Sequence, residues 1–113
     1  MAVWLKAFSI TPSGAETLLY SFKGGSGDGE DPYAGLLNVK GTLYGTAKSG
    51  GARDDGTVFK ITTSGTETVL YSFKGSGDGE NPNGVLLNVK GKLYGTTEDG
   101  GVSNQGTVFS LSP

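Results

Sequence analysis

The side chains best suited to chemistry are carboxylates that stand among glycines in two segments of similar sequence. The segments are GGSGDGEDP at positions 24–32 and GSGDGENP at positions 75–82. Carboxylate oxygens on a flexible loop are typical calcium ligands in proteins. The segments lack the ligand spacing of the twelve-residue EF-hand loop. The calcium site that they predict would take one Asp and one Glu from each segment: Asp28, Glu30, Asp78 and Glu80.

The same segments can be explained without a ligand. Asp-Gly and Asn-Pro pairs favour tight turns, and glycine supplies the backbone conformations that such turns require. We favour this interpretation, in which these segments simply form turns and the chain needs no cofactor. Calcium is the one cofactor that remains as an alternative.

Other kinds of site chemistry are excluded by residue types that the chain lacks. It contains no histidine, the commonest general base and a member of the Ser-His-Asp triad. It contains no cysteine either, so disulfides, thiolate metal sites and cysteine nucleophiles are excluded. The sequence therefore predicts no catalytic residues.

Charge and hydrophobicity argue against two classes of partner. The formal net charge is -2 and the pI is near 4.9, which argues against nucleic acid as a partner. No apolar run approaches the roughly 20 residues that span a bilayer, so we expect no membrane insertion. The first ten residues lack the charged start, apolar middle and cleavage site of a signal peptide.

Two long repeats must position the glycine-rich segments. Positions 8–24 align with 59–75, with 13 of 17 residues identical. Positions 26–62 then align with 76–112, with 22 of 37 residues identical. Self-similarity at a fixed period indicates a repeat architecture. The alignment places the first repeat at about 8–58 and the second at about 59–108, within a single unit that spans 1–113.

Each repeat contains four strand-like segments that are separated by turns. In the fully covered repeat we expect strands at 34–39, 42–47, 56–62 and 67–73. Lys40-Gly41 and Ser64-Gly65 would make tight hairpins, whereas the other two connections are longer. No window shows the 3.6-residue apolar spacing of a helix, so the chain is expected to be all-β.

Apolar residues fall on both faces of the expected strands. Val69 and Tyr71, for example, alternate with Leu70. Strands that are buried on both faces imply sheets stacked on sheets, as blades stack around the axis of a β-propeller. A β-sandwich and a stacked β-solenoid are the competing architectures. A four-stranded meander that recurs about every 50 residues favours the propeller, with two four-stranded antiparallel blades per chain.

Several strand sequences resemble a known repeat. They are GTVFKI at 56–61, LYSF at 70–73 and LYGTT at 93–97, followed by Gly100-Gly101. These motifs resemble the GloVer (Gloeobacter/Verrucomicrobia) repeat, and the resemblance covers nearly the whole chain. It implies that the parent proteins are extracellular or at the cell surface, and it implies no known activity. The strand order is similar to that of NHL-type blades.

The order of the strands predicts self-assembly. The chain starts with counterparts of the last two strands of a blade, at 6–11 and 16–22. Its final part, at 84–111, supplies the first three strands of another blade. Two blades cannot bend into a ring, and an open pair would expose strand edges and apolar faces.

We therefore expect a cyclic homo-oligomer with head-to-tail contacts. Three chains would supply six blades and four chains would supply eight; we expect three. The strand at 106–111 would close the shared blade, in which it competes with the strand at 6–11, and the sequence does not decide between them.

In such a meander the long connections gather at one edge of each blade, opposite the tight turns. Binding residues often lie on loops that a rigid scaffold holds in place. The candidate ligand-binding residues are the polar residues of these connections: Asp28, Glu30, Asp31, Arg53, Asp54, Asp55, Asp78, Glu80, Asn81, Asn104 and Gln105.

The leading hypothesis is a non-enzymatic binding or scaffold module whose ligand is a glycan or a surface protein. Repeated equivalent sites suit multivalent binding. One alternative is a calcium-dependent hydrolase of the six-bladed propeller type, which would use the four carboxylates named above. Another is a piece of a longer repeat array, or an engineered repeat, with no activity of its own.

Overall fold

The structure is a computed structural model that describes residues 6–75 and 77–113. Every regular element in these residues is a strand, which confirms the all-β prediction. This part of the chain contains no helix that is long and apolar enough to cross a membrane. Residues 1–5, part of the segment considered above for a signal peptide, and Ser76, in the second glycine-rich segment, lie outside the described residues.

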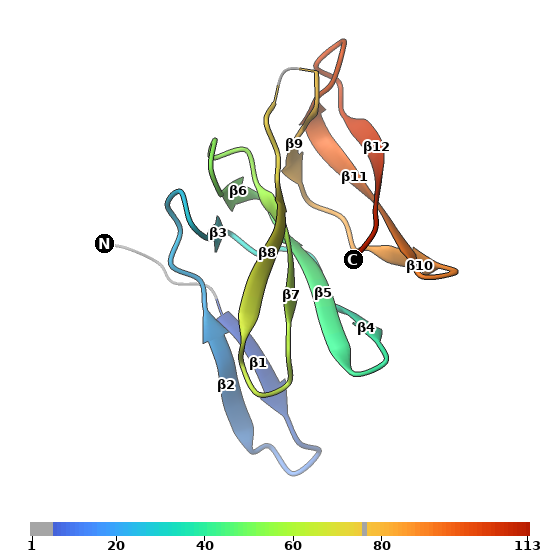
Figure 1. The fold of residues 1–113 in the computed structure, drawn as a ribbon. Coiled ribbons are helices and arrows are strands. Elements are labelled where there is room, and N and C mark those ends of the chain that lie inside the picture. Colours follow the sequence, from blue (N-terminus) through green and yellow to red (C-terminus); the bar gives the residue numbers. More distant parts are fainter. Residues whose placement is uncertain (1–5, 76) are drawn as a thin grey trace.

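The strands form three antiparallel sheets that follow one another along the chain (Figure 1). The first sheet pairs β1 (Lys6–Ile10) with β2 (Glu16–Ser21). The middle sheet has the order β4 (Leu37–Val39), β5 (Thr42–Ala47), β7 (Thr57–Ile61) and β8 (Glu67–Ser72). The last sheet has the order β10 (Leu87–Val89), β11 (Lys92–Gly100) and β12 (Thr107–Leu111), and β9 (Gly79–Pro82) pairs with the far end of β11. A separate two-stranded ladder joins β3 (Gly29–Glu30) to β6 (Ser49–Gly50).

The four strands expected in the fully covered repeat are present in the predicted order. β5 has the predicted bounds, β7 and β8 are slightly shorter than predicted, and β4 begins three residues later. The registers also repeat between sheets. Phe59 faces Val69 across β7 and β8, and Phe8 faces Leu18 in the same way across β1 and β2.

The sequence did not indicate that the long connections pair with one another. Gly29 lies opposite Gly50, and Gly79 lies opposite Gly100. Gly50 makes this close approach possible, because a Cβ at this position would lie 2.7 Å from the carbonyl oxygen of Asp28. Its φ of 82° also favours glycine. The long connections are therefore ordered by short ladders rather than left as free loops.

The first and middle sheets pack face to face around aromatic side chains. Phe22, which follows β2, contacts Phe59 of β7 with ring centroids 4.9 Å apart. Ala7, Ala47 and Ile61 complete this buried cluster. Apolar side chains packed between two sheets are removed from water, which is the main force that holds such sheets together.

The middle and last sheets pack in the same way through the opposite face of the middle sheet. Val58 is fully buried there, together with Tyr44 and Phe73 from the middle sheet. Leu86 and Leu93 contribute from the last sheet. Because Val58 and Phe59 are neighbours on one strand, they point to opposite faces, so the middle sheet is covered on both sides.

The two outer faces of the stack expose the counterparts of these buried residues. Val108 of the last sheet is 80% exposed, whereas Val58, its counterpart in the middle sheet, is fully buried. At the other end, Phe8 is 54% exposed and its counterpart Phe59 is 1% exposed. Further exposed apolar residues at the two ends are Ile10 and Leu18 in the first sheet, and Leu87, Val89 and Tyr94 in the last sheet.

Candidate functional site

The long connections lie at one end of the strands, and the tight turns lie at the other end (Figure 1). The turn between β4 and β5 places Lys40 at φ 53° and Gly41 at φ 89°. Two successive positive φ values are those of the type I′ hairpin. We call the opposite end the loop edge; it consists of residues 23–33, 48–56, 74–83 and 98–106, apart from Ser76.

Asp28 is the buried anchor of the first glycine-rich segment, and it is 5% exposed. Its Oδ2 accepts hydrogen bonds from the Tyr20 hydroxyl at 2.7 Å and from the Lys23 backbone N–H at 2.8 Å. Its Oδ1 accepts a third bond from the Gly29 N–H at 2.8 Å. Burial and the bond to Asp28 both raise the pKa of the Tyr20 hydroxyl above its usual range. A buried carboxylate with three donors holds the turn in place.

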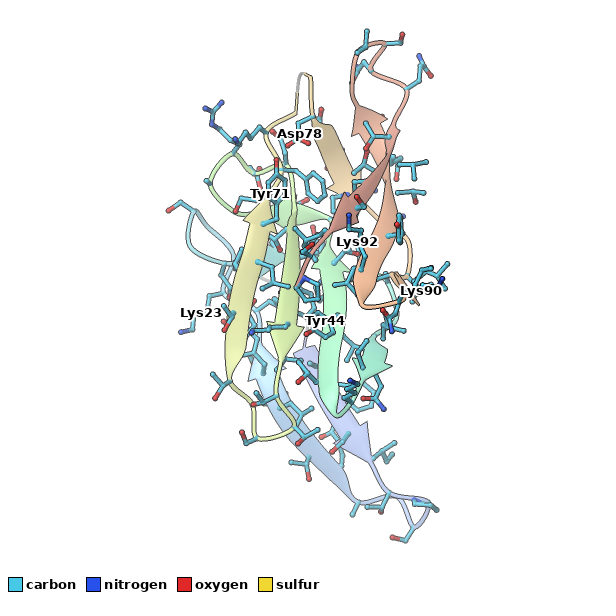
Figure 2. The ribbon with its side chains drawn as sticks, turned by 45° about the vertical axis from the view of Figure 1, so that its right-hand side comes forward. Lys23, Tyr44, Tyr71, Asp78, Lys90 and Lys92 are labelled. Carbon is cyan, nitrogen blue, oxygen red and sulfur yellow. The ribbon has the colours of Figure 1, made fainter. Side chains whose placement is uncertain are left out.

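Asp78 repeats this arrangement in the second segment. Its Oδ2 accepts hydrogen bonds from the Tyr71 hydroxyl at 2.7 Å and from the Lys74 backbone N–H at 3.1 Å. Figure 2 shows the side chains of Tyr71 and Asp78 next to one another. Partial burial by itself would raise the pKa of Asp78. The two hydrogen bonds above, a third from the Gly79 N–H, and the positive charge of Lys74 outweigh this effect, so the pKa of Asp78 is lowered. The tyrosines were not predicted as site residues, although the sequence contains one usable signal for their role: Tyr and Asp recur together in both repeats.

Glu67, the first residue of β8, was not predicted as a site residue. Burial is the main cause that raises the pKa of its carboxyl to about 7, and the neighbouring Asp28 raises it further, whereas Lys23 lowers it. The Glu67 Oε2 atom is buried and has no hydrogen-bond partner among the residues that the structure describes. Two carboxyl groups placed close together in a partly buried site favour the protonated form of one of them.

Glu67 should make the stability of the fold depend on pH. Because its pKa is raised on folding, its contribution to stability is fully present below the unfolded value of 4.5 and is lost as the pH rises through about 7. We expect the melting temperature to fall between pH 5 and pH 8, and Glu67→Gln to remove most of that fall. Scanning calorimetry across this pH range measures it, with Glu30→Gln, an exposed carboxylate, as the control. An identical pH profile for wild type and Glu67→Gln would contradict this account.

Four further candidates shape the backbone of the loop edge. Asp31, Asp54, Asn81 and Asn104 have φ between 54° and 60°, the left-handed region that Asp and Asn tolerate best. The side chain of Asp54 accepts a hydrogen bond from the Gly50 N–H at 2.8 Å, and Asn104 accepts the equivalent bond from Gly100 at 2.9 Å. These residues therefore fix the conformation of the loops.

Two of the remaining candidates, Glu30 and Arg53, lie beside a hollow at the loop edge. Glu30, Arg53 and Asp54 line a shallow hollow of about 450 Å³, together with Gly25, Ser26, Gly51 and Ala52. Gln105 is exposed on the last loop. The hollow is therefore an open surface that carries charged side chains of both signs.

The four carboxylates proposed for calcium do not gather at one point. Asp28 and Glu30 lie on one connection, and Asp78 and Glu80 lie on the next. The carboxylates of Glu80 and Asp55 both lie beside Gly75, since a Cβ there would be 3.8 Å from Glu80 Oε1 and 2.9 Å from Asp55 Oδ2. The described part of the chain holds no group of three or more Asp or Glu side chains placed to bind a metal ion. Calcium needs six to eight oxygen ligands, so the arrangement in one chain does not fit such a site.

One ion pair joins the loops of neighbouring sheets. Lys48 Nζ lies 3.5 Å from Glu98 Oε2, and the two residues occupy equivalent positions in the two repeats. The charge difference between these loops is visible in the sequence, but their contact is not.

Comparison with known proteins identifies a repeat family. The family model of the Gloeobacter/Verrucomicrobia repeat matches residues 6–113. No curated protein matches the chain, and no solved structure matches it.

Proposed function

Because the chain belongs to the Gloeobacter/Verrucomicrobia repeat family, we propose that it is a non-enzymatic scaffold module that joins copies of itself into a closed β-propeller. In this arrangement the middle sheet is a complete blade. The last sheet of one copy and the first sheet of the next copy share a blade. Three chains would form six blades, which we favour, and four chains would form eight.

One observation carries the proposal: each outer face of the stack exposes apolar residues whose counterparts in the middle sheet are buried against a neighbouring sheet. Val58 and Tyr44 are buried against Leu86 and Leu93 of the last sheet. Their counterparts Val108 and Tyr94 instead line an open groove of about 210 Å³. A face built to be covered, but left exposed, indicates an interaction surface. Leu36, the counterpart of Leu86, is itself 38% exposed and would reach this groove from a second copy.

The charges of Lys48 and Glu98 also support a second copy of the chain as the partner. Lys48 of the middle sheet pairs with Glu98 of the last sheet. In a ring, the next neighbour of Glu98 would be Lys48 of the second copy, so opposite charges would alternate at every junction. Complementary charges favour this order of sheets over one that places like charges together.

The loop edge is the surface that we propose for binding a ligand, either a glycan or a surface protein. Its hollow beside Arg53 and Glu30 supports this role, and a ring would present several copies of it on one face. Linked copies of a weak site gain avidity when the ligand is itself repeated. A glycan array and a pull-down from bacterial surface proteins test this part of the proposal, and negative results in both would refute it.

The assembly is tested by the mass of the chain in solution. Light scattering on a sizing column should give three times the chain mass of 11.6 kDa, or four times that mass for an eight-bladed ring. A mass of one chain at micromolar concentration would overturn the proposal, because the two exposed faces would then be stable without a partner.

A further inference from the structure

We propose that the outer edge of β12 is completed by β2 of a second copy of the chain, which places Glu16 of that copy in a pocket beside Tyr71 and Asp78. This inference rests on the proposed function, because it specifies how two copies form a shared blade. The strand order of that blade is β10, β11 and β12 of one copy, followed by β2 of the second copy.

The pocket lies beside the outer edge of β12, where the described residues supply no further strand. It has a volume of about 200 Å³. Tyr71 lines it from β8 and Asp78 from the connection that follows β8, whereas Ser110 and Leu111 line it from β12. The pocket therefore combines an apolar wall with a hydrogen-bonded Tyr–Asp pair.

At the junction between the first and middle sheets, the position equivalent to this pocket is occupied by Glu67. There, Glu67 is the register partner of Ile61 and begins β8. Its carboxyl lies near Tyr20 and Asp28 and has one buried oxygen. Tyr71, Asp78 and Leu111 are the repeat counterparts of Tyr20, Asp28 and Ile61. The pocket is thus the position of a strand that starts with the counterpart of Glu67.

The chain contains a strand of the required sequence. β2 reads ETLLYS and β8 reads ETVLYS, so Glu16 is the counterpart of Glu67. The backbone has matching partners as well, because the Phe73 N–H donates to the Gly56 carbonyl at 2.9 Å after β8. Gly106 stands in the position of Gly56, with the same φ of 104°, and Phe22 of a second copy would be its donor.

β2 can reach β12 only if it separates from β1, which pairs with the same edge within one chain. β1 is weakly held: Ala7 is its buried apolar residue, whereas Phe8 and Ile10 are 54% and 61% exposed. Among the strands of residues 6–75 and 77–113, β1 pairs with β2 alone. Releasing β1 therefore exposes little apolar surface.

β12 is held more firmly than β1. Phe109 packs against Phe73 with ring centroids 5.1 Å apart, and Leu111 joins the same buried cluster. The Thr107 N–H donates to the Thr97 hydroxyl oxygen at 3.0 Å. When β12 takes the place of β1 of the second copy, Val108 occupies the position of Ala7. Valine there buries more apolar surface than alanine does. β12 is therefore the strand that stays in the shared blade, and β1 is the strand that is displaced.

Cysteine cross-linking tests this register, because the chain has no cysteine of its own. Lys60 and Thr68 are register partners in the middle sheet, and their counterparts are Ser110 and Thr17. We expect the double variant Thr17→Cys with Ser110→Cys to form disulfide-linked oligomers on oxidation. The matched control, Leu18→Cys with Ser110→Cys, shifts the register by one residue and should link at least about tenfold less, because disulfide geometry is strict.

A second pair of cysteines reports the alternative arrangement. Tyr44 and Lys60 are register partners, so Tyr94→Cys with Ser9→Cys would link copies only if β1 of the second copy replaced β12. Linking by this pair alone would overturn the inference and leave the proposed assembly intact. Failure of both pairs in a sample with the mass of several chains would also overturn the inference. A mass of one chain would overturn the proposed function, and the inference with it.

Discussion

Replacing Phe59 by alanine should lower the free energy of unfolding by about 3–5 kcal/mol, the usual cost of deleting a buried aromatic side chain. Phe59 is 1% exposed and contacts Phe22 edge-on across the junction of the first and middle sheets. Small domains have a total stability of about 5–15 kcal/mol, so this single loss could unfold the chain. Urea unfolding followed by circular dichroism measures the change, at concentrations where the chain is monomeric.

The repeat supplies two matched controls for Phe59→Ala. Phe8→Ala removes the same side chain from the equivalent position in the first sheet, where it is 54% exposed, and should cost less than about 1 kcal/mol. Phe109→Ala, at the half-buried equivalent in the last sheet, should fall between the two. Equal costs at the three positions would mean that the sheets do not stack as described.

Replacing Val108 by aspartate should convert the proposed assembly into single chains of 11.6 kDa. Val108 is 80% exposed in one chain, so the change leaves the fold of that chain intact. At a junction between copies, however, it would place a charge where the counterpart Val58 is fully buried. Burial of an unpaired charge costs several kcal/mol, which is enough to dissociate a contact between copies.

Light scattering measures the result for Val108→Asp against a matched variant, Val102→Asp. Val102 is fully exposed on the loop between β11 and β12, away from the apolar face, and its replacement should leave the mass unchanged. If Val108→Asp kept the mass of the wild type, this face would not be the junction between copies.

The strands could be predicted from the sequence because their signals are local. Alternating apolar residues and paired turn residues such as Lys40-Gly41 are visible in any window of the chain. Because the two repeats align, a strand assigned in one repeat could also be assigned in the other. β5 was predicted with its observed bounds. β4 was predicted three residues too long, because Ala34 to Leu36 continue the apolar pattern without pairing to β5.

The contacts of the loop edge could not be predicted in this way, because they join residues that are distant in the sequence. Gly29 meets Gly50, and Glu67 lies near Asp28. Nothing within a short window distinguishes a buried Asp28 from a solvated one. The sequence therefore assigned these polar residues to loops, but it did not show which of them hold the backbone and which face solvent.

The ion pair between Lys48 and Glu98 has a consequence for how the repeats can be combined. The two positions are equivalent in the two repeats, and they carry opposite charges. An array made of either repeat alone would place lysine beside lysine, or glutamate beside glutamate, at every boundary, and like charges at that distance repel. The two repeats are therefore complementary at this position, and they are not interchangeable even though both fold into the same kind of antiparallel sheet.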